Sequence, residues 1–217
     1  MAAQFVYASD QSILVVLGDG ATLDAHRRVL AFLRALEIEP IDGVLNVHPA
    51  YCSVLVRFDA VRFAHGDMNS RLAAAIERAA SVPEVGSRLV RIPVRYGGED
   101  GPDLDWLAEY HSMTPAQVVD AHASARYRVH FLGFAPGFAY LGGLPESLAT
   151  PRLANPRQAV RAGSVGIGGS QTGVYALPTP GGWRIIGRTP LVMFDPTRAP
   201  MSLLAIGDEV TFEPVRV

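Results

Sequence analysis

The chain has 217 residues, a formal net charge of −2 at pH 7 and 49% hydrophobic residues, a composition typical of a globular protein of one or two domains. All 19 basic residues are arginines, so the chain can build neither a P-loop, which needs a lysine on the phosphates, nor a Schiff base, which needs an amine. The balanced charge provides no general basic field for nucleic acid or acidic lipid, and we expect no partner of either kind.

The compartment is indicated by the cysteine content and by the uncharged segments. Cys52 is the only cysteine, which permits no disulfide within the chain and favours a reducing environment; we expect a buried, unreactive thiol. Residues 1–10 lack the basic segment and apolar core of a signal peptide. The longest uncharged runs, 129–145 and 162–183, contain too many glycines and prolines for a membrane helix. We therefore expect a cytoplasmic protein.

Residues 1–95 predict a small α/β domain. In chain order we expect a strand, a helix, two strands joined at Pro49-Ala50, a helix and a last strand, over residues 12–18, 22–36, 43–48, 51–58, 67–80 and 88–95. Thr22 is placed to cap the first helix, whose leucines at 23, 30, 33 and 36 are spaced along one side. The order β-α-β-β-α-β is that of a ferredoxin-like domain, which hosts many functions and specifies none.

Residues 96–125 predict a connector of two short helices. Asp103 can cap a helix that ends near His111, and the sequence from Thr114 to Gln117 matches a capping box with proline at the first helical position. His111 and His122 each lie near the end of a predicted helix, where a histidine commonly interacts with the last carbonyls. The six histidines include no pair three or four residues apart, so we expect no metal site.

From residue 126 to 217 the pattern changes to short apolar runs broken by glycine and proline. The strands we expect cover residues 128–134, 163–168, 173–177, 183–187 and 209–214. Short strands at this spacing, with no long amphipathic helix, predict an all-β barrel or sandwich. The whole chain is thus expected to be α+β, with a ferredoxin-like domain followed by an all-β domain.

The segment from Arg161 to Pro190 concentrates the unusual residues of the chain. It contains seven glycines between its first two arginines, Arg161 and Arg184, and no charged residue between them. Alternating glycines suggest tightly turned strands around a bound group, since glycine permits close backbone approach. The segment is not a dinucleotide-binding fingerprint, because Gln171 stands where GxGxxG requires glycine. The chain also lacks the GxSxG motif that would indicate a serine hydrolase.

Charge and polarity point to an anion site in the same part of the chain. Residues 121–194 contain seven arginines and one acid, and guanidinium groups bind carboxylate or phosphate bidentately. Arg152, Arg157 and Arg188 are our candidates for holding such a group. Gln171 and Thr172 are candidates for hydrogen-bonding an amide or its developing oxyanion. Arginines that merely decorate the surface would give the same count.

The aromatic segment FLGFAPGFAY, residues 131–140, is either barrel core or the apolar wall of a ligand pocket. The pocket interpretation makes Phe134, together with Tyr175 further along the chain, a substrate-binding residue. The core interpretation is the more common outcome for aromatic residues that alternate with turn formers.

Several long motifs in order resemble the KipI/PxpB family, also called allophanate hydrolase subunit 1. The matching segments are NVHPAYCSVLVRFD (46–59), IPVRYGGEDGPDL (92–104), FLGFAPGFAYLGGLP (131–145), TPRLANPR (150–157), AGSVGIGGSQTGVYALPTPGGWRIIGRTP (162–190) and VMFDP (192–196). The resemblance extends over essentially the whole chain. It implies a small N-terminal α/β domain and a cyclophilin-like β-barrel, with no implication of prolyl isomerase activity.

The same resemblance implies a function. Members of this family serve as one subunit of the bacterial ATP-dependent 5-oxoprolinase, which opens 5-oxoproline to L-glutamate with hydrolysis of ATP. They work with a PxpC-type subunit, related to allophanate hydrolase subunit 2, and with a PxpA-type protein. Because this chain has no P-loop and no lysine, we expect ATP to bind at a site shared with, or located on, a partner, and we expect the subunit to be inactive alone.

Two other functions stay open for a chain of this resemblance. Some members resemble inhibitors of histidine kinases, which would make the chain a regulatory binding protein. In fused urea carboxylases the related modules form the carboxyl-transfer portion, which would make it a carboxyl-transfer subunit of urea or allophanate metabolism. The genes beside the coding sequence would distinguish these alternatives.

Overall fold

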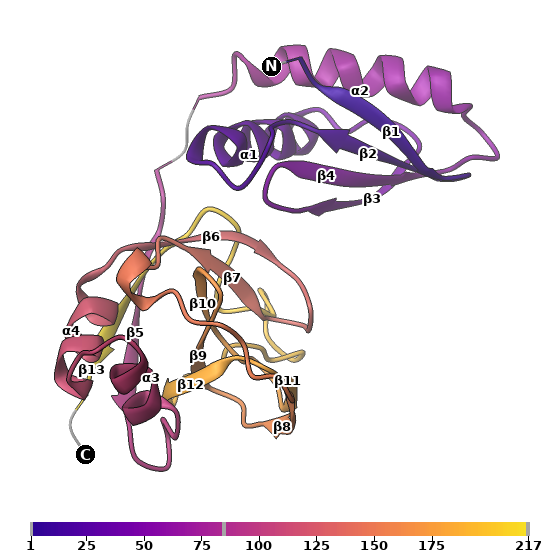
Figure 1. Cartoon of the computed structure of the whole chain (residues 1–217). Helices are drawn as coiled ribbons and strands as arrows, with labels where there is room; N and C mark the ends of the chain where they lie inside the picture. The colour runs from indigo at the N-terminus through magenta and orange to yellow at the C-terminus, as the bar shows by residue number, and fades with distance from the viewer. Residues whose placement is uncertain (1, 84–85, 216–217) are drawn as a thin grey trace. The chain divides into compact units, whose positions relative to one another are not determined.

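The computed structural model describes residues 2–83 and 86–215, and the chain forms two compact units, residues 1–86 and 87–217 (Figure 1). The fold is of the α+β class. Helices accompany an antiparallel sheet in the first unit and a closed barrel in the second.

The first unit is a four-stranded antiparallel sheet in the order β1-β2-β4-β3, accompanied by two helices. Its elements are β1 (Gln4–Ser9), β2 (Ser12–Val16), α1 (Leu23–Ile38), β3 (Val44–Pro49), β4 (Ser53–Phe58) and α2 (His65–Ala79). Side chains alternate across the sheet, and Val15 and Val56 on the central strands are fully buried. Phe32 of α1 and Met68 of α2 are also fully buried, so both helices contribute to this core.

Helix α1 begins where the sequence predicts. The hydroxyl of Thr22 accepts a hydrogen bond from the main-chain nitrogen of Ala25 at 3.1 Å, which satisfies one of the free donors of the first turn. The predicted leucine side is only partly correct, since Leu36 is buried but Leu23 is 61% exposed. The buried side is instead made largely of alanine, valine and phenylalanine, so a pattern of leucines alone misplaces it.

The ferredoxin-like order is not found. The first unit has the order β-β-α-β-β-α, and its additional strand is β1, at the N-terminus. Five of the six residues of β1 are exposed, so the segment lacks the alternation of buried residues that would reveal a strand in the sequence. The strand expected at 88–95 does form, but it belongs to the second unit.

The second unit is built around a closed seven-stranded barrel in the order β10-β7-β6-β13-β5-β12-β9. Its elements are β5 (Leu89–Tyr96), α3 (Leu104–Tyr110), α4 (Pro115–Ser124), β6 (Tyr127–Leu132), β7 (Ala139–Gly142), the 3₁₀ turn η1 (Glu146–Leu148), β8 (Arg157–Val160), β9 (Ser164–Gly168), β10 (Gln171–Val174), β11 (Thr179–Gly181), β12 (Arg184–Arg188) and β13 (Glu209–Pro214). β8 and β11 form a separate two-stranded sheet. The barrel predicted from residue 126 onward is confirmed, and β5 completes it by pairing in parallel with β13 and antiparallel with β12.

The barrel has an interior core and a second, aromatic cluster. Val165 and Ile167 of β9 belong to the interior core, while Phe138, Val160, Tyr175, Trp183 and Ile185 form the second cluster. The intervening glycines of β9 point the other way, toward Trp183. A Cβ on Gly168 would lie 2.5 Å from the indole, and a Cβ on Gly173 of β10 would lie 3.2 Å from it. The group that these glycines accommodate is therefore a tryptophan of the same chain.

The two short helices of residues 96–125 form as predicted, but only one carries the predicted cap. Thr114 and Gln117 make the complete capping box at the start of α4. Asp103 stands at the N-cap position of α3 without capping it. Its carboxylate instead accepts hydrogen bonds from Arg157 at 2.8 and 2.9 Å and from the main-chain nitrogen of Ile185 at 2.6 Å. Asp103 thus ties α3 to β8 and β12.

Candidate functional site

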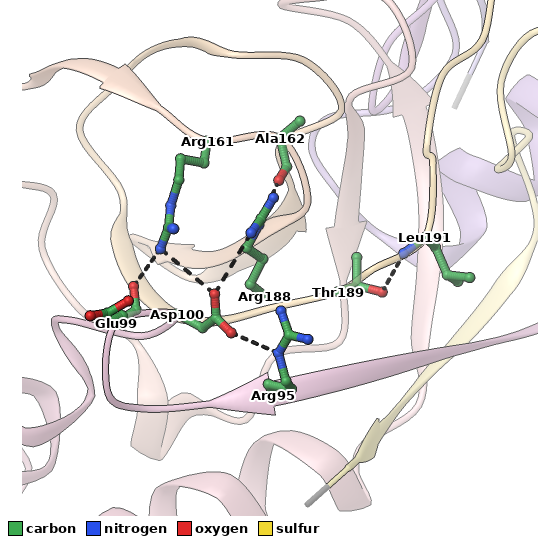
Figure 2. Close-up of polar contacts among 8 residues, drawn as sticks. All are labelled: Arg95, Glu99, Asp100, Arg161, Ala162, Arg188, Thr189 and Leu191. Carbon is green, nitrogen blue, oxygen red and sulfur yellow. Dashed lines mark hydrogen bonds and ion pairs between the residues drawn. The ribbon is translucent and has the colours of Figure 1, made fainter. Parts of the chain in front are cut away.

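Three arginines gather around one carboxylate beside the barrel strands β5 and β12 (Figure 2). We call Arg95, Arg161 and Arg188 the arginine cluster; Arg95 lies near the end of β5, Arg188 ends β12, and Arg161 follows β8. The carboxylate is that of Asp100, in the loop after β5. Of our predicted site residues, Arg188 is the one that belongs to this cluster.

Two of the three arginines, Arg95 and Arg188, lie opposite each other on neighbouring strands. Arg188 and Arg95 are directly paired in the antiparallel register of β12 and β5. Like charges directly opposite on neighbouring strands are destabilising, so this arrangement requires a compensating anion. Asp100 provides part of it, because its Oδ2 accepts a hydrogen bond from Nε of Arg95 at 2.7 Å.

Asp100 reaches the other two arginines only at longer range. Nη2 of Arg161 lies 3.6 Å and Nη1 of Arg188 lies 3.9 Å from Oδ1 of Asp100, both beyond hydrogen-bond length. These two arginines are held by main-chain carbonyls instead: Arg161 donates to the oxygen of Glu99 at 2.6 Å, and Arg188 donates through Nε to the oxygen of Ala162 at 3.0 Å. The guanidinium groups are therefore oriented by the backbone.

The loop that carries Asp100 depends on glycine. Gly97 and Gly98 both have positive φ values, 73° and 53°, which glycine adopts without steric penalty. Gly101 lies directly against β12, where an added Cβ would be 2.1 Å from the carbonyl oxygen of Ile186. The sequence YGGEDG therefore folds back on the barrel and brings Asp100 to the arginines.

The cluster is partly shielded from solvent. Side-chain exposure is 37% for Arg95, 33% for Arg188 and 57% for Arg161, whereas Asp100 is 19% exposed. Charges at this depth are screened less by salt than fully exposed charges. Asp100 and Arg95 are not among our sequence candidates; both lie in the segment IPVRYGGEDGPDL, but the cross-strand pairing of Arg95 with Arg188 leaves no signal in the sequence.

Four of the predicted residues lie in or beside the aromatic cluster that contains Trp183 rather than in the arginine cluster. The guanidinium of Arg152 is 5.8 Å from the centre of the Trp183 ring, and Arg157 donates to the carbonyl oxygen of Trp183 at 3.2 Å. Tyr175 is buried in the aromatic cluster. Phe134 is 62% exposed, and its ring lies 5.4 Å from that of Phe138 and 6.4 Å from that of Tyr175.

Two of these four residues serve the fold. The guanidinium of Arg157 is occupied by Asp103, whose side chain is 10% exposed. Tyr175 is 2% exposed, and its burial raises the pKa of the phenol. Arg152 and Phe134 are the exposed members, so only they present a surface to a ligand. Of the four aromatic residues of the segment 131–140, Phe138 is buried, Phe131 and Tyr140 are partly buried and Phe134 is exposed, so the core interpretation is correct only in part.

Thr172 is a structural residue as well. It is fully buried, and its hydroxyl donates to the carbonyl oxygen of Gly166 at 3.0 Å. It therefore accepts the 2.9 Å hydrogen bond from Nε2 of His122, which leaves Nδ1 of His122 to accept from the hydroxyl of Tyr96 at 2.7 Å. Gln171, one residue earlier, is half-buried at the start of β10, opposite Gly168.

The helix-end roles predicted for the histidines are wrong. His122 is fully buried between Tyr96 and Thr172, and burial lowers its pKa from 6.5 to about 3. His111 instead shares a hydrogen bond of 2.9 Å with the hydroxyl of Thr150. Each histidine joins a helix to a distant segment, a contact that sequence spacing cannot reveal.

Within residues 2–83 and 86–215, no group of three or more His, Cys, Asp or Glu side chains is arranged to hold a metal ion. Among the helices described, none has the length and apolar character needed to cross a membrane.

Comparison with known proteins gives a consistent match. The sequence model of one family, described as carboxyltransferase domain, subdomain C and D, matches residues 3–204. The B subunit of the 5-oxoprolinase of Bacillus subtilis (strain 168) is 39% identical over 223 residues, which cover 96% of this chain and 91% of that protein. The corresponding B subunit of Escherichia coli O157:H7 is 57% identical over 138 residues, 64% of this chain and 62% of that protein.

Longer proteins contain a similar module. The crystallised protein TTHA0988 superimposes with a TM-score of 0.83 at 35% identity over 95% of this chain, which spans only 40% of that protein. The urea carboxylase of Kluyveromyces lactis superimposes with a TM-score of 0.75 at 22% identity. The match covers 99% of this chain and 22% of the urea carboxylase, and it shows a similarity of fold alone. The urea amidolyase of Saccharomyces cerevisiae is 25% identical over 84% of this chain and 11% of its own length.

Proposed function

The chain belongs to the family of carboxyltransferase domains, subdomains C and D, and we propose that within it this protein is one subunit of a 5-oxoprolinase. The observation that carries the proposal is the 39% identity to the B subunit of the B. subtilis 5-oxoprolinase, because the match extends over 96% of this chain and 91% of that protein. The reaction we propose is the opening of 5-oxoproline to L-glutamate, coupled to hydrolysis of ATP.

The chemistry requires two kinds of recognition. 5-Oxoproline carries a carboxylate and a lactam carbonyl. Transfer of the γ-phosphoryl group of ATP to the lactam oxygen, with release of ADP, would activate the carbonyl carbon toward attack by water. A lactam is a poor electrophile near neutral pH, so its oxygen must be activated before the C–N bond breaks. Oriented arginines bind the anionic groups of such reactants, and amide or backbone donors stabilise the developing oxyanion.

The arginine cluster supplies the anion-binding part of this proposal. Its guanidinium groups are oriented by main-chain carbonyls and one carboxylate, which is the preorganisation that binding without reorganisation requires. Gln171 remains our candidate for the donor to the lactam carbonyl. Thr172 is not included, because its hydroxyl is already used inside the barrel.

The proposed enzyme is a complex. A protein without lysine cannot supply the usual phosphate-binding lysine, so we propose that ATP is bound in part by other subunits, of the PxpC and PxpA types. The subunit alone is then expected to be inactive. The proposal that ATP is bound with the help of other subunits fails if the isolated chain binds ATP at micromolar affinity in a calorimetric titration.

The test is an assay of the assembled complex. The chain is co-expressed with its neighbouring PxpC-type and PxpA-type genes, and glutamate released from 5-oxoproline is measured with and without ATP. Arg188→Ala and Gln171→Ala should each remove most of the activity while the complex still assembles. Arg91→Ala, which removes an exposed arginine of β5 that pairs with Glu213, should leave the activity unchanged. Full activity in both site variants would contradict the proposed site.

A second candidate function is that of a carboxyl-transfer subunit. It is favoured by the family description and by the similarity to urea amidolyase, at 25% identity over 84% of the chain. The same complex, assayed with urea and a carboxylated biotin donor, would then transfer carboxylate and release no glutamate from 5-oxoproline. A biotin carboxylase gene beside the coding sequence would be the corresponding genomic observation.

A further inference from the structure

The arginine cluster has more positive charge than its surroundings neutralise. Arg95, Arg161 and Arg188 all lie within 4 Å of a single carboxylate, that of Asp100, which leaves two positive charges unbalanced. The loop contains two other acids. Asp103 is paired with Arg157, and Glu99 contributes its main-chain oxygen to Arg161 while its carboxylate is directed away from the cluster (Figure 2). The imbalance lies where Arg188 and Arg95 are opposed across two strands.

The cluster also has unused hydrogen-bond donors. A guanidinium group has five N–H donors in a planar fork. Among the contacts of the described residues, each of the three arginines makes a single hydrogen bond, to Asp100, Glu99 or Ala162. Arg95 and Arg188 are anchored through Nε, so both of their terminal nitrogens remain available to a ligand.

Building on the function proposed above, we propose that the arginine cluster binds a phosphoryl group rather than the carboxylate of 5-oxoproline. A phosphate ester carries about −1.5 to −2 charges near neutral pH and offers three strong acceptor oxygens, whereas a carboxylate carries one charge and two oxygens. The charge of a phosphate dianion matches the two unbalanced positive charges of the cluster, and its three acceptor oxygens match the three arginines. Planar bidentate donors are the side chains best suited to this group.

Asp100 has a defined part in this site. Its carboxylate lies between the three guanidinium groups and holds Arg95 in place, but it also competes electrostatically with an incoming anion (Figure 2). Removing its charge should therefore strengthen phosphate binding, whereas removing an arginine should weaken it. Opposite effects from two neighbouring substitutions distinguish a binding site from a merely structural ion-pair network.

The experiment is a titration of the full-length chain with inorganic phosphate, followed through the Nε–Hε resonances of its arginines by NMR. We expect the resonances of Arg95 and Arg188 to shift with a common saturation curve. Arg188→Gln should weaken binding by about tenfold or more, and Asp100→Asn should strengthen it by a similar factor. Arg91→Gln is the matched control on β5 and should leave the affinity unchanged.

Parallel titrations with ATP and with 5-oxoproline identify the source of the group. Tighter binding of ATP than of phosphate, lost in Arg188→Gln, assigns the site to the nucleotide. Equal binding of the two assigns it to a free phosphoryl group formed in the reaction. Stronger binding of 5-oxoproline than of phosphate would overturn the proposal, as would equal losses in Arg188→Gln and Arg91→Gln.

These outcomes are independent of the enzymatic assay. Phosphate binding is measured on the isolated chain, whereas the proposed function is measured as glutamate released by the complex. Glutamate release by a complex whose cluster binds no phosphate would reject this inference and retain the function. Phosphate binding without glutamate release in the assembled complex would retain this inference and reject the proposed function.

Discussion

The indole of Trp183 lies against β9 and β10, which explains why these two strands are so rich in glycine. Gly168 and Gly173 point toward Trp183, while Ile167 and Val165 point into the barrel. An indole that lies directly on a sheet needs a flat strand surface, and an added Cβ would come too close to the ring at Gly168 and into tight contact with it at Gly173. The alternation of glycine with apolar residues thus lets one strand pack against the interior core on one face and against the aromatic cluster on the other.

This packing gives a prediction for single substitutions. Gly168→Ala places a Cβ 2.5 Å from Trp183 and should destabilise the second unit by about 1–3 kcal/mol. Gly182→Ala is the matched control, since its Cβ would have its nearest neighbours at 3.6–3.8 Å, which is ordinary contact. Both tryptophans, Trp106 and Trp183, lie in the second unit, so urea unfolding followed by tryptophan fluorescence reports on that unit. Equal stability of the two variants would show that the indole can move away.

The buried His122 makes the second unit sensitive to acid. Burial lowers its pKa from 6.5 to about 3, so the unfolded chain binds a proton that the folded chain excludes between these pH values. Stability contributed by the neutral histidine is complete above pH 6.5 and is lost progressively as the pH falls toward 3. The expected slope is about 1.4 kcal/mol per pH unit from this one group.

His122→Gln tests this linkage. Glutamine can still accept from Tyr96 and donate to Thr172, but it does not titrate, so the free energy of unfolding should fall less steeply between about pH 6 and pH 4. His48→Gln changes an exposed histidine of the first unit and should leave the pH dependence of the tryptophan-detected unfolding unchanged. An unaltered slope in His122→Gln would mean that other groups cause the acid sensitivity.

At the scale of elements, the sequence predicts what is locally encoded. The caps at Thr22 and Thr114 and the strand Glu209–Pro214 are found as expected, because capping residues and alternating apolar residues act over a few positions. The short strands β7, β8 and β11 leave no periodic signal, since each has only three or four residues. The partners of β5, which are β12 and β13, leave no signal in the sequence either, because pairing between residues more than ninety positions apart is decided by the assembled barrel.

Asp103 shows how a tertiary contact overrides a local preference. The residue has the type and position of an N-cap, yet its carboxylate binds Arg157 and the nitrogen of Ile185. Asp103→Ala removes three hydrogen bonds and leaves a partly buried arginine unpaired, which should cost about 2–4 kcal/mol in the second unit. Asp105→Ala, at an exposed position of the same helix, should cost less than about 0.5 kcal/mol.

A double-mutant cycle with Arg157→Ala separates the contribution of the Asp103–Arg157 ion pair from the other contributions of Asp103 to stability. If Asp103 acts through Arg157, the double variant should be less destabilised than the sum of the single variants, measured again by tryptophan fluorescence in urea. Strict additivity would instead mean that Asp103 acts independently of Arg157, through the hydrogen bond that its carboxylate accepts from the nitrogen of Ile185.

The candidate site follows the same division between local and distant information. Composition identifies arginine as the anion-binding residue of this chain, and Arg188 is a candidate for that reason. Arg152 and Arg157 have the same composition signal but lie against Trp183, and Thr172 faces the interior. Which arginines converge depends on the pairing of β5 with β12 and on the glycine loop after β5, neither of which a single sequence specifies.

At the scale of the whole molecule, the position of β5 decides where the second unit begins. Residues 89–94 of β5 pair in parallel with residues 209–214 of β13, and Arg95 and Tyr96 pair with β12. Without β5 the barrel would open between β12 and β13, exposing two strand edges. The side chains of Ile92 and Val94, both fully buried, would be missing from the core. A barrel of residues 96–217 is therefore incomplete, although the change in sequence pattern begins only at residue 126.

Two truncated chains test this boundary. Residues 87–217 should fold alone, with a cooperative urea transition whose tryptophan midpoint matches that of the full chain, because both tryptophans and all seven barrel strands are retained. Residues 96–217 should show no cooperative transition, since the segment removed, 87–95, includes the buried side chains of Ile92 and Val94. The comparison requires only fluorescence and circular dichroism on the three chains. A cooperative transition of similar midpoint in 96–217 would show that β5 is an accessory strand, and it would move the start of the barrel domain to residue 96.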